Sequence, residues 1–545
     1  MTAEKNILWI MCDQLRFDYL SCAGHPHLET PNIDRLAARG VRFSRAYAQS
    51  PICGPSRMSF YTGRYVHSHG SSWNKFPLRA GEPTLGDHLK EIGVRNVLVG
   101  KTHMKADVAG MQRLGIDPNS DIGIRVAQCG FEPYERDDGL HPPGPYDPDP
   151  AYETYLRAQG YDGDNPWEDW ANSAEDADGN RLSGWLLENA DKPARVAKEH
   201  SETAYMTDRA MAFMRDAKGD GRPWCLHLSY IKPHWPYIAP PPYHALYGGE
   251  HVLPAVRDEA ERRNPHPIYA SYLNERFSLV FARQGVRERV IPAYMGLIKQ
   301  IDDELGRLFA FLDEQGLSER TMIVFTSDHG DYLGDHWLGE KELFHEPSVK
   351  IPLIVYDPSP EADATRGAVS DDLVEAIDLA PTFLDYLGGA PKPHVLEGLS
   401  LLPGIRRTGA PERRDYVVSE YDYAMRRART DLNVPISAAR LTMIFDGRWK
   451  YIHAEGFRPM LFDLETDPNE LADRGEDPDF AAERARLHET LFAWIRQRRN
   501  RITISDEEIA ERAGREIRVD IRIGYWDEDE VAEARARGTG VPPIS

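Results

Sequence analysis

The 545-residue chain has few cysteines, and their spacing does not suggest pairs. The five are Cys12, Cys22, Cys53, Cys129 and Cys225, an odd number without a Cys-x-x-Cys motif. A disulfide framework or a zinc–thiolate cluster needs paired or regularly spaced cysteines. Both are therefore excluded, and we expect reduced thiols, as in a cytoplasmic protein.

Positive charge is also scarce. The chain has 65 lysines and arginines against 87 aspartates and glutamates, which gives a formal net charge of −22. Nucleic acids and anionic membrane surfaces are bound through a positive footprint, so we expect neither as a partner. A small anion can still bind where a few cations converge locally.

Long apolar runs are absent from the sequence. No stretch approaches the roughly 20 apolar residues of a membrane-spanning helix. Residues 1–6 lead directly into a strand-like segment, without the basic and apolar regions of a signal peptide. We therefore expect a cytoplasmic protein with no membrane partner.

Short apolar segments rich in β-branched residues alternate with helical patterns. They predict buried strands of a parallel sheet at residues 7–11, 94–99, 225–231, 322–326 and 352–356. Helices are predicted at 30–40, with proline near the start and glycine at the end, and around 294–312. This alternation predicts an α/β domain with helices on both faces of the sheet.

Other regions depart from that alternation. Residues 131–195 and 240–267 are rich in loop-forming residues, and we interpret them as insertions that serve as lids, binding loops or interface elements. Beyond about residue 411 the pattern predicts a smaller α+β unit. Its elements are a hairpin over 437–452, a strand at 461–464 and an amphipathic helix at 480–496.

The last 45 residues are charged and lack clear periodicity. They form either a disordered tail or an arm that packs on another subunit. We favour the arm, and with it a homo-oligomer (a dimer or tetramer), because apolar residues are available for contacts. These are Ile517, Val519, Ile521, Ile523, Tyr525 and Trp526.

Cys53 lies in the segment Ser50–Arg57, Ser-Pro-Ile-Cys-Gly-Pro-Ser-Arg, which is followed by Thr-Gly-Arg at 62–64. Most free cysteines are small buried thiols, and a five-residue pattern recurs by chance. The choice between a thiol and a reactive residue depends on whether the chain also supplies a metal site and anion-binding groups. The position just before Gly-Pro also predicts a helix N-terminus, where the helix dipole favours an anion.

Two predicted strands are followed by residues of the types that ligate metal ions. Asp13 and Gln14 follow the first strand, and Asp328 and His329 follow the strand at 322–326. Each pair alone is also typical of turns. Because the carboxyl ends of parallel strands share one edge, we expect the pairs to meet. They predict one divalent metal; the imidazole favours Mn²⁺, with Ca²⁺ next.

Cationic groups follow the neighbouring strands. Lys101 and His103 come after the strand at 94–99, His234 comes after 225–231, and Lys341 lies a short loop beyond His329. Singly, such a lysine is usually a solvated charge and such a histidine is usually structural. Together they would reverse the local field in an acidic protein and attract an anionic substrate.

The order of these motifs resembles that of the formylglycine-dependent (type I) sulfatases. The shared motifs are Asp-Gln, Cys-x-Pro-x-Arg, Gly-Lys-x-His, Pro-His-x-Pro, Asp-His-Gly and a following lysine. The C-terminal segments 449–452 and 461–464 resemble that family's second domain. The resemblance implies an alkaline-phosphatase-like fold, with a mixed, mostly parallel sheet sandwiched by helices. It assigns residues 1–410 to the catalytic domain, 411–499 to a small antiparallel sheet and helix, and 500–545 to the arm.

Within this superfamily the chain is most similar to phosphonate monoester hydrolases and related bacterial sulfatases. This similarity rests on the following segments: Asp13-Gln14, Trp73-Asn74, Asp328-His329, residues 334–341 and the arm after Arg499. Phosphonate hydrolases usually have Tyr and Thr where this chain has Lys101 and His103. The Lys-x-His pair is the sulfatase choice, which implies small sulfate monoesters, above all aryl sulfates. Phosphonate monoesters or phosphodiesters, and choline-type alkyl sulfates, are the alternatives.

The resemblance also implies the nucleophile. A formylglycine-generating enzyme would oxidise Cys53 to formylglycine, whose hydrate attacks sulfur and forms a covalent sulfated hemiacetal. Arg57 would orient this nucleophile. His103 would then deprotonate the second hydroxyl, so that the hemiacetal collapses and expels sulfate.

The remaining residues would act on the substrate. Asn74, Lys101, His234 and Lys341 would bind the sulfate oxygens, while His234, aided by Lys341, protonates the leaving oxygen. A two-metal phosphatase would need further Asp and His ligands, which the sequence does not convincingly supply. A catalytically inactive binding protein is the alternative from another class.

Overall fold

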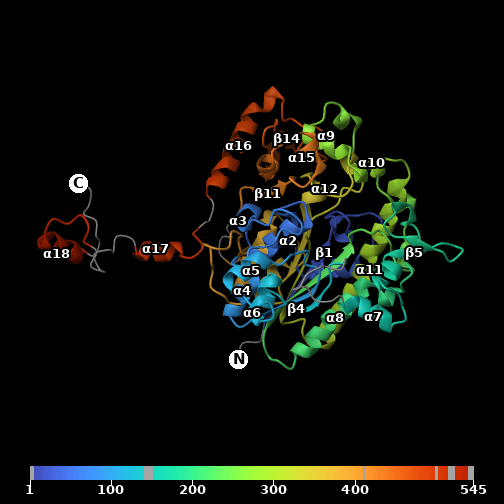
Figure 1. The fold of residues 1–545 in the computed structure, drawn as a ribbon, viewed down its shortest axis with the longest axis horizontal. Helices are drawn as coiled ribbons and strands as arrows, with labels where there is room; N and C mark the ends of the chain where they lie inside the picture. The colour runs from blue at the N-terminus through green and yellow to red at the C-terminus, as the bar shows by residue number, and fades with distance from the viewer. Residues whose placement is uncertain (1–4, 140–150, 409–412, 498–500, 513–521, 538–545) are drawn as a thin grey trace.

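A central eight-stranded sheet organises the computed structural model of the chain (Figure 1). The structure describes residues 5–139, 151–408, 413–497, 501–512 and 522–537. Among these residues, every helix is too short or too polar to span a membrane.

Seven of the eight strands of the central sheet run in the same direction. Their order is β10 (Ala368–Glu375), β2 (Val41–Tyr47), β9 (Lys350–Tyr356), β8 (Thr321–Ser327), β1 (Asn6–Asp13), β7 (Trp224–Pro233), β3 (Arg95–Gly100) and β4 (Glu132–Arg136). The exception is β9, which is antiparallel to both neighbours. The prediction of a parallel strand at 352–356 was therefore wrong in direction. Only a three-residue helical turn and the four-residue α12 (Glu346–Val349) lie between β8 and β9, too short for a crossover, so the chain turns back at the same edge of the sheet.

One edge of the sheet was mistaken for an insertion. Residues 131–195 were interpreted as lying outside the scaffold, but Glu132–Arg136 pairs in parallel with β3 as strand β4. Its sequence, EPYER, is polar because an edge strand has one unpaired side. The insertion therefore begins after β4. It contains α7 (Ala151–Ala158) and the hairpin of β5 (Ser173–Glu175) and β6 (Arg181–Ser183).

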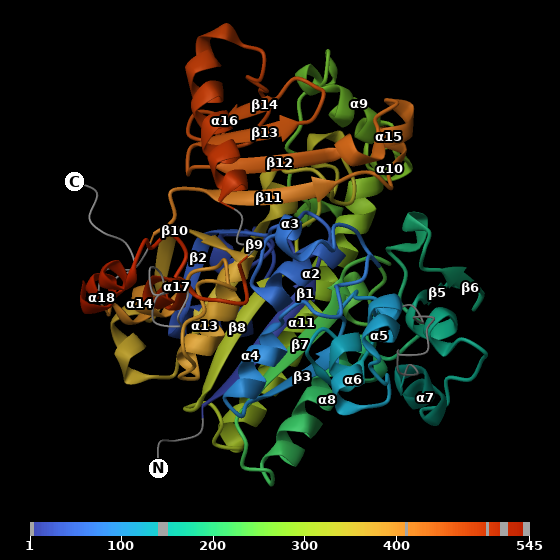
Figure 2. The ribbon, with the colours of Figure 1, turned by 60° about the vertical axis from the view of Figure 1, so that its left-hand side comes forward.

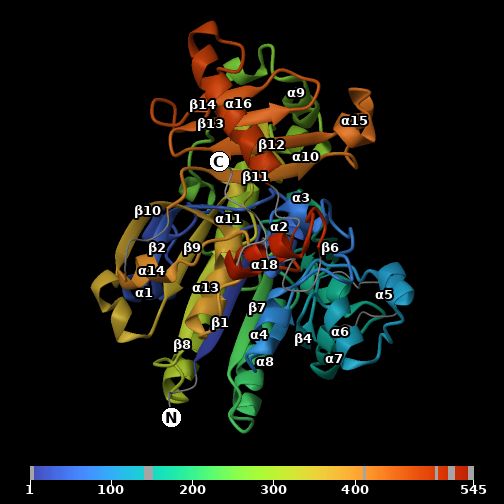
Figure 3. The ribbon, with the colours of Figure 1, turned by 90° about the vertical axis from the view of Figure 1, so that its left-hand side faces the viewer.

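Helices cover both faces of the sheet, as the sequence predicted. Successive side chains of β1 alternate between the faces. Leu8 and Ile10 pack with α1 (Pro31–Arg39), α8 (Glu202–Ala217) and α11 (Val286–Glu314). Ile7, Trp9 and Met11 pack with α2 (Cys53–Thr62), α4 (Leu85–Glu91) and α13 (Leu379–Tyr386). Figure 3 shows α4 and α13 in front of the sheet.

Shorter helices complete this domain. They are α3 (Val66–His69), α5 (Val108–Leu114), α6 (Asp121–Ala127), α9 (Pro267–Leu273), α10 (Arg276–Phe281), α12 (Glu346–Val349) and α14 (Leu402–Arg406), whereas α15 (Arg427–Asp431) belongs to the C-terminal unit. The predicted helices at 30–40 and 294–312 correspond to α1 and part of α11. The mixed, mostly parallel α/β architecture is thus confirmed.

A separate antiparallel sheet lies at the top of Figures 1 and 2. Its strands, in sequence and spatial order, are β11 (Val417–Asp422), β12 (Arg440–Phe445), β13 (Trp449–Ala454) and β14 (Met460–Asp463). Leu487 and Leu491 of α16 (Ala481–Arg496) pack on one face. The predicted hairpin, strand and amphipathic helix are therefore present. The predicted boundary at 410/411 lies outside the described residues.

The C-terminal arm projects from the body of the molecule in Figure 1. Its described helices are α17 (Asp506–Arg512) and α18 (Glu528–Arg537). Ile523 and Trp526 are each 89% exposed, whereas Tyr525 packs against Val531 and Ala534. Of the other apolar residues predicted to make contacts, Ile517, Val519 and Ile521 lie outside the described residues. Packing on another subunit stays a prediction.

Candidate active site

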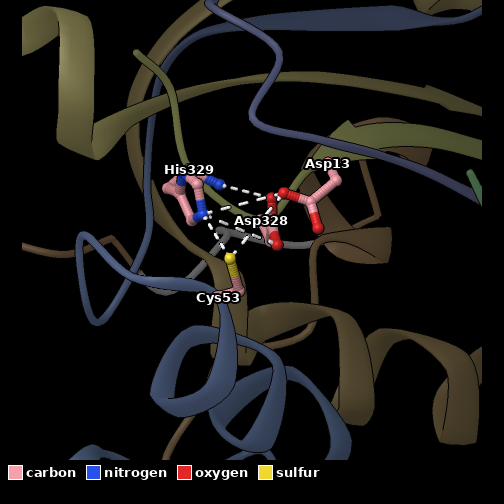
Figure 4. Close-up of side chains that lie close together, drawn as sticks. All are labelled: Asp13, Cys53, Asp328 and His329. Carbon is pink, nitrogen blue, oxygen red and sulfur yellow. Dashed lines mark hydrogen bonds and ion pairs between the residues drawn. The ribbon is translucent and has the colours of Figure 1, made fainter. Parts of the chain in front are cut away.

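The predicted metal ligands meet Cys53 at the carboxyl edge of the sheet (Figure 4). Asp13 ends β1, Asp328 and His329 follow β8, and Cys53 begins α2. One ligand atom from each of these four residues lies within 4.8 Å of the others. The expectation that separate strand ends converge here is confirmed.

The backbone places Cys53 at the first position of α2, as predicted. The amide of Gly54 donates a hydrogen bond of 2.7 Å to Oδ1 of Asn74. A Cβ at position 54 would lie 2.9 Å from that oxygen, so the close approach requires glycine. Asn74 therefore anchors the start of α2, where the helix dipole favours negative charge on residue 53.

The Cys53 thiol lies among cationic groups. Its Sγ is 3.0 Å from Nε2 of His329, 3.4 Å from Nζ of Lys341 and 3.7 Å from Oδ1 of Asp13. Burial raises the pKa of the thiol, but Lys341, His329 and Lys101 outweigh burial and hold it well below its usual range. The surroundings thus stabilise an anion at this position.

Arg57 holds the carboxylates of Asp13 and Asp328, two of the predicted metal ligands, in place. The fully buried guanidinium donates from Nε to Asp328 at 2.8 Å and from Nη2 to Asp13 at 3.2 Å. Its Nη1 donates to Ser229 Oγ and to the carbonyl of Lys101. These hydrogen bonds go to residues beside Cys53, the predicted nucleophile, so Arg57 positions the site through the two carboxylates.

His329 and Gln14 are oriented by neighbours that turn their ligand atoms toward the site. Nδ1 of His329 lies 2.9 Å from the carbonyl of Gly330, which can only accept, so Nδ1 carries the proton. In the neutral ring Nε2 then presents a lone pair. The amide nitrogen of Gln14 donates to Asp331, which also accepts from Tyr237. This leaves Oε1 of Gln14 as the atom that faces Lys341, at 2.7 Å.

Lys341 and His234 form a hydrogen-bonded pair, with Nζ and Nε2 3.2 Å apart. Nδ1 of His234 donates to the carbonyl of Trp235 at 2.6 Å, so Nε2 accepts from Lys341. Burial and the Lys341 charge lower the pKa of His234 to about 3. Burial disfavours the charge of Lys341, but Cys53 and Glu340 outweigh it and raise its pKa. The proton of the pair therefore resides on Lys341.

Lys101 and His103 also lie near the thiol. Gly100, with φ +109°, brings the backbone against β7 just before Lys101, which forms an ion pair with Asp13. Asp138 accepts the backbone amide of His103 at 2.9 Å and fixes this loop. The imidazole of His103 contributes to the lowered pKa of Cys53. Its Nδ1 is buried and has no hydrogen-bond partner among the described residues.

Four supporting residues were not predicted from the sequence, namely Asp138, Ser229, Tyr237 and Asp331. Asp331 offered a signal, because it belongs to the same strand end as Asp328. Asp138 follows β4 as the other candidates follow their strands, but that strand had been assigned to an insertion. The positions of Ser229 and Tyr237 follow from pairing across the sheet, which the local sequence does not indicate.

Comparisons with known proteins agree with this geometry. The model of the Sulfatase family matches residues 5–390, and the model described as N-sulphoglucosamine sulphohydrolase, C-terminal, matches residues 334–497. The multifunctional alkaline phosphatase superfamily protein PehA of Trinickia caryophylli is 32% identical over 508 residues, which are 88% of this chain and 93% of PehA. The arylsulfatase of Clostridium perfringens is 27% identical, over 86% of this chain and 89% of its own.

The solved structures include a similar enzyme. Phosphonate monoester hydrolase SpPMH from Silicibacter pomeroyi superposes with a TM-score of 0.79 at 28% identity, over 93% of this chain and 98% of its own. The family match spans most of the chain, and the convergent site lies within it. The protein therefore belongs to the sulfatase family of the alkaline phosphatase superfamily and is a sulfuric ester hydrolase.

Proposed function

We propose that this protein hydrolyses small sulfate monoesters, preferably aryl sulfates, at a formylglycine residue formed from Cys53. The observation that carries the proposal is the set of cationic and imidazole groups around Cys53. Lys101 and Lys341 supply two buried positive charges in a chain whose net charge is −22. Such a set suits a sulfate group, whose charge is spread over its oxygens.

The residues present fit a divalent metal ion. Asp13, Gln14, Asp328 and His329 would hold it, with Mn²⁺ favoured over Ca²⁺ because one ligand is an imidazole. The orientation of His329 by Gly330 and of Gln14 by Asp331 is the support that metal ligands normally receive. When bound, the ion would supply positive charge that favours an ionised nucleophile and polarises sulfate oxygens.

Position 53 also fits formylglycine, an aldehyde whose hydrate offers one hydroxyl for attack and a second for release of sulfate. The imidazole of His103, which interacts with Cys53, is the proposed base for that second hydroxyl. The helix N-terminus and the nearby cations favour an anion at the attacking position. A formylglycine-generating enzyme is thus the proposed maturation partner.

The Lys341–His234 pair is placed to protonate the leaving oxygen. Lys341 holds the proton and donates its hydrogen bond to the neutral imidazole. As negative charge develops on the leaving oxygen, this pair supplies the proton. Lys101, which pairs with Asp13 and interacts with Cys53, is proposed to bind the non-reacting oxygens of the sulfate.

Two measurements test the proposal. The protein is produced together with a formylglycine-generating enzyme, and the mass of the tryptic peptide containing Cys53 is measured. We expect the aldehyde rather than the thiol. Values of kcat/KM are then compared for 4-nitrophenyl sulfate and 4-nitrophenyl phenylphosphonate, with Cys53→Ala as the control. An unmodified thiol in fully active protein would contradict the nucleophile, and a preference for the phosphonate would contradict the substrate.

A phosphonate monoester hydrolase or phosphodiesterase is the second candidate. The similarity to SpPMH over 93% of this chain favours it. The same site residues would serve both reactions, so we expect phosphonate hydrolysis as a secondary activity.

A further inference from the structure

A row of aromatic side chains runs from the catalytic edge into the insertion. The ring centroids of His234 and Trp235 are 4.3 Å apart, those of Trp235 and Trp185 are 5.5 Å apart, and those of Trp185 and Trp167 are 5.9 Å apart. We call Trp235, Trp185 and Trp167 the tryptophan row. It joins the imidazole beside Lys341 to a part of the chain remote in sequence.

Two members of the row are fixed in orientation by their indole nitrogens. Nε1 of Trp167 donates to Glu202 at 3.0 Å. Nε1 of Trp185 donates to both carboxylate oxygens of Glu168, at 2.9 and 3.0 Å. A ligand that stacks on the partly exposed Trp185 ring therefore meets a surface that is already ordered, which lowers the entropy cost of binding.

The third member, Trp235, has a different environment at its nitrogen. Nε1 of Trp235 is buried and has no hydrogen-bond partner in the described part of the chain. A buried N–H without an acceptor is unfavourable, so an acceptor on a bound molecule would be stabilised there. The row thus offers both an aromatic surface and one unused donor.

Trp185 also exposes apolar surface beside a polar catalytic centre. It is 39% exposed, and the adjacent Leu186 is 52% exposed. Apolar side chains together with one directed polar group are typical of a ligand subsite. Because Trp235 packs on the His234 ring, the row lies next to the pair that protonates the leaving oxygen.

We propose that Trp185 and Trp235 form the leaving-group subsite, and that it takes an aryl group bearing a hydrogen-bond acceptor. The assignment rests on the proposed function, because the leaving oxygen must reach the Lys341–His234 pair. An aryl ring stacks on the Trp185 indole while its acceptor receives the N–H of Trp235. A quaternary ammonium group could face the same rings but has no acceptor for this N–H.

The test uses Trp185→Ala and Trp235→Phe, with Trp170→Ala as the matched control. Trp170 belongs to the same insertion but stacks on Arg195 and Tyr161, outside the row. Each variant is compared with the unsubstituted protein on 4-nitrophenyl, phenyl, ethyl and choline sulfate. For each substrate, the kcat/KM of the variant is divided by that of the unsubstituted protein, which cancels differences in intrinsic reactivity between the substrates.

Trp185→Ala should lower kcat/KM about tenfold for the two aryl esters and less than about twofold for ethyl sulfate. Trp235→Phe keeps an aromatic ring but loses the donor, so it should lower only the 4-nitrophenyl value, about fivefold. Trp170→Ala should change none of them. An equal loss on aryl and ethyl esters, no loss on the aryl esters, or a greater loss on choline sulfate would overturn the subsite.

The subsite can be separated from the proposed substrate. The Kd of 4-nitrophenol is measured by titration with each protein, independently of turnover. Trp185→Ala should weaken it about tenfold, and an unchanged Kd would contradict the subsite. If only phosphonates are hydrolysed, the aryl and ethyl monoesters of phenylphosphonate replace the sulfates. The same ratios would then support the subsite while the sulfate ester proposal fails.

Discussion

The two sides of the site are built from different parts of the molecule. On the nucleophile side, Asp13, Cys53, Arg57, Asp328 and His329 are all 0% exposed and lie at strand ends, in the loop after them or in α2. On the proposed leaving-group side, Trp185 of the insertion is 39% exposed. A buried scaffold holds the groups around Cys53, whereas the partly exposed Trp185 of the insertion is proposed to face the variable part of the substrate.

This contrast has a physical basis. Arg57 is a buried cation between two buried carboxylates, and removing one partner of such a set leaves an unpaired charge, at a cost of about 3–5 kcal/mol. The nucleophile side therefore tolerates little change. A partly exposed ring such as Trp185 can be exchanged at small cost, which allows specificity to vary while the chemistry stays fixed.

The largest effect is expected at Cys53. Cys53→Ala removes the nucleophile and should lower kcat on the order of 10⁴-fold or more with unchanged folding. Cys53→Ser should permit at most one slow turnover, because serine lacks the second hydroxyl that releases sulfate. Single-turnover kinetics and thermal melting measure both. Steady turnover by the serine variant would argue against release through a second hydroxyl.

The next effect concerns the groups beside the nucleophile. The double change Lys101→Tyr and His103→Thr removes the base and one cation, so kcat on sulfate esters should fall roughly 10²-fold or more. The ratio of phosphonate to sulfate ester hydrolysis should rise. Lys105→Tyr is the control, because Lys105 is an exposed lysine in the same loop. An unchanged ratio would mean that position 101 and position 103 do not set the preference.

Much of the nucleophile side could be predicted from the sequence. A parallel sheet brings the carboxyl ends of its strands to one edge, so Asp13, Asp328 and Lys101 could be placed together before their contacts were known. Local patterns also predicted the start of α2 at Cys53. The elements missed depend on pairing over long sequence separations. The reversed direction of β9 and the edge position of β4, which places Asp138, are both of this kind.

The proposed leaving-group side was harder to predict from the sequence, for a related reason. The richness of the insertion in tryptophan was evident, but composition does not indicate which ring approaches His234. That contact depends on how the insertion folds against the loop after β7. On the nucleophile side, the orientation of Gln14 by Asp331 also depends on a contact between residues distant in sequence, and a substitution at Asp331 tests it.

Asp331→Asn should weaken metal binding about 10- to 100-fold. The new amide can turn its N–H toward Gln14, which would then turn its own oxygen away from the ligand position. Metal affinity is measured by competition with a chelator. Tyr237→Phe is the matched control, since it removes the other donor to Asp331 and a long contact of 3.5 Å with Gln14 but leaves the hydrogen bond between Gln14 and Asp331 intact. Equal affinities for Asp331→Asn and the unsubstituted protein would exclude this orienting role.

The smallest effect on catalysis is expected from the arm. Trp526 and Ile523 of the arm are largely exposed, so they are proposed to contact another copy of the chain. Removing residues 500–545 should lower the mass measured by light scattering to that of the monomer. Because the described active-site residues all lie before position 342, kcat on a small ester should change less than about twofold. Trp526→Ala should weaken assembly in the same direction, whereas Glu511→Ala, in α17, should not. If the truncated chain keeps its oligomeric mass, the contacts between subunits lie elsewhere in the molecule.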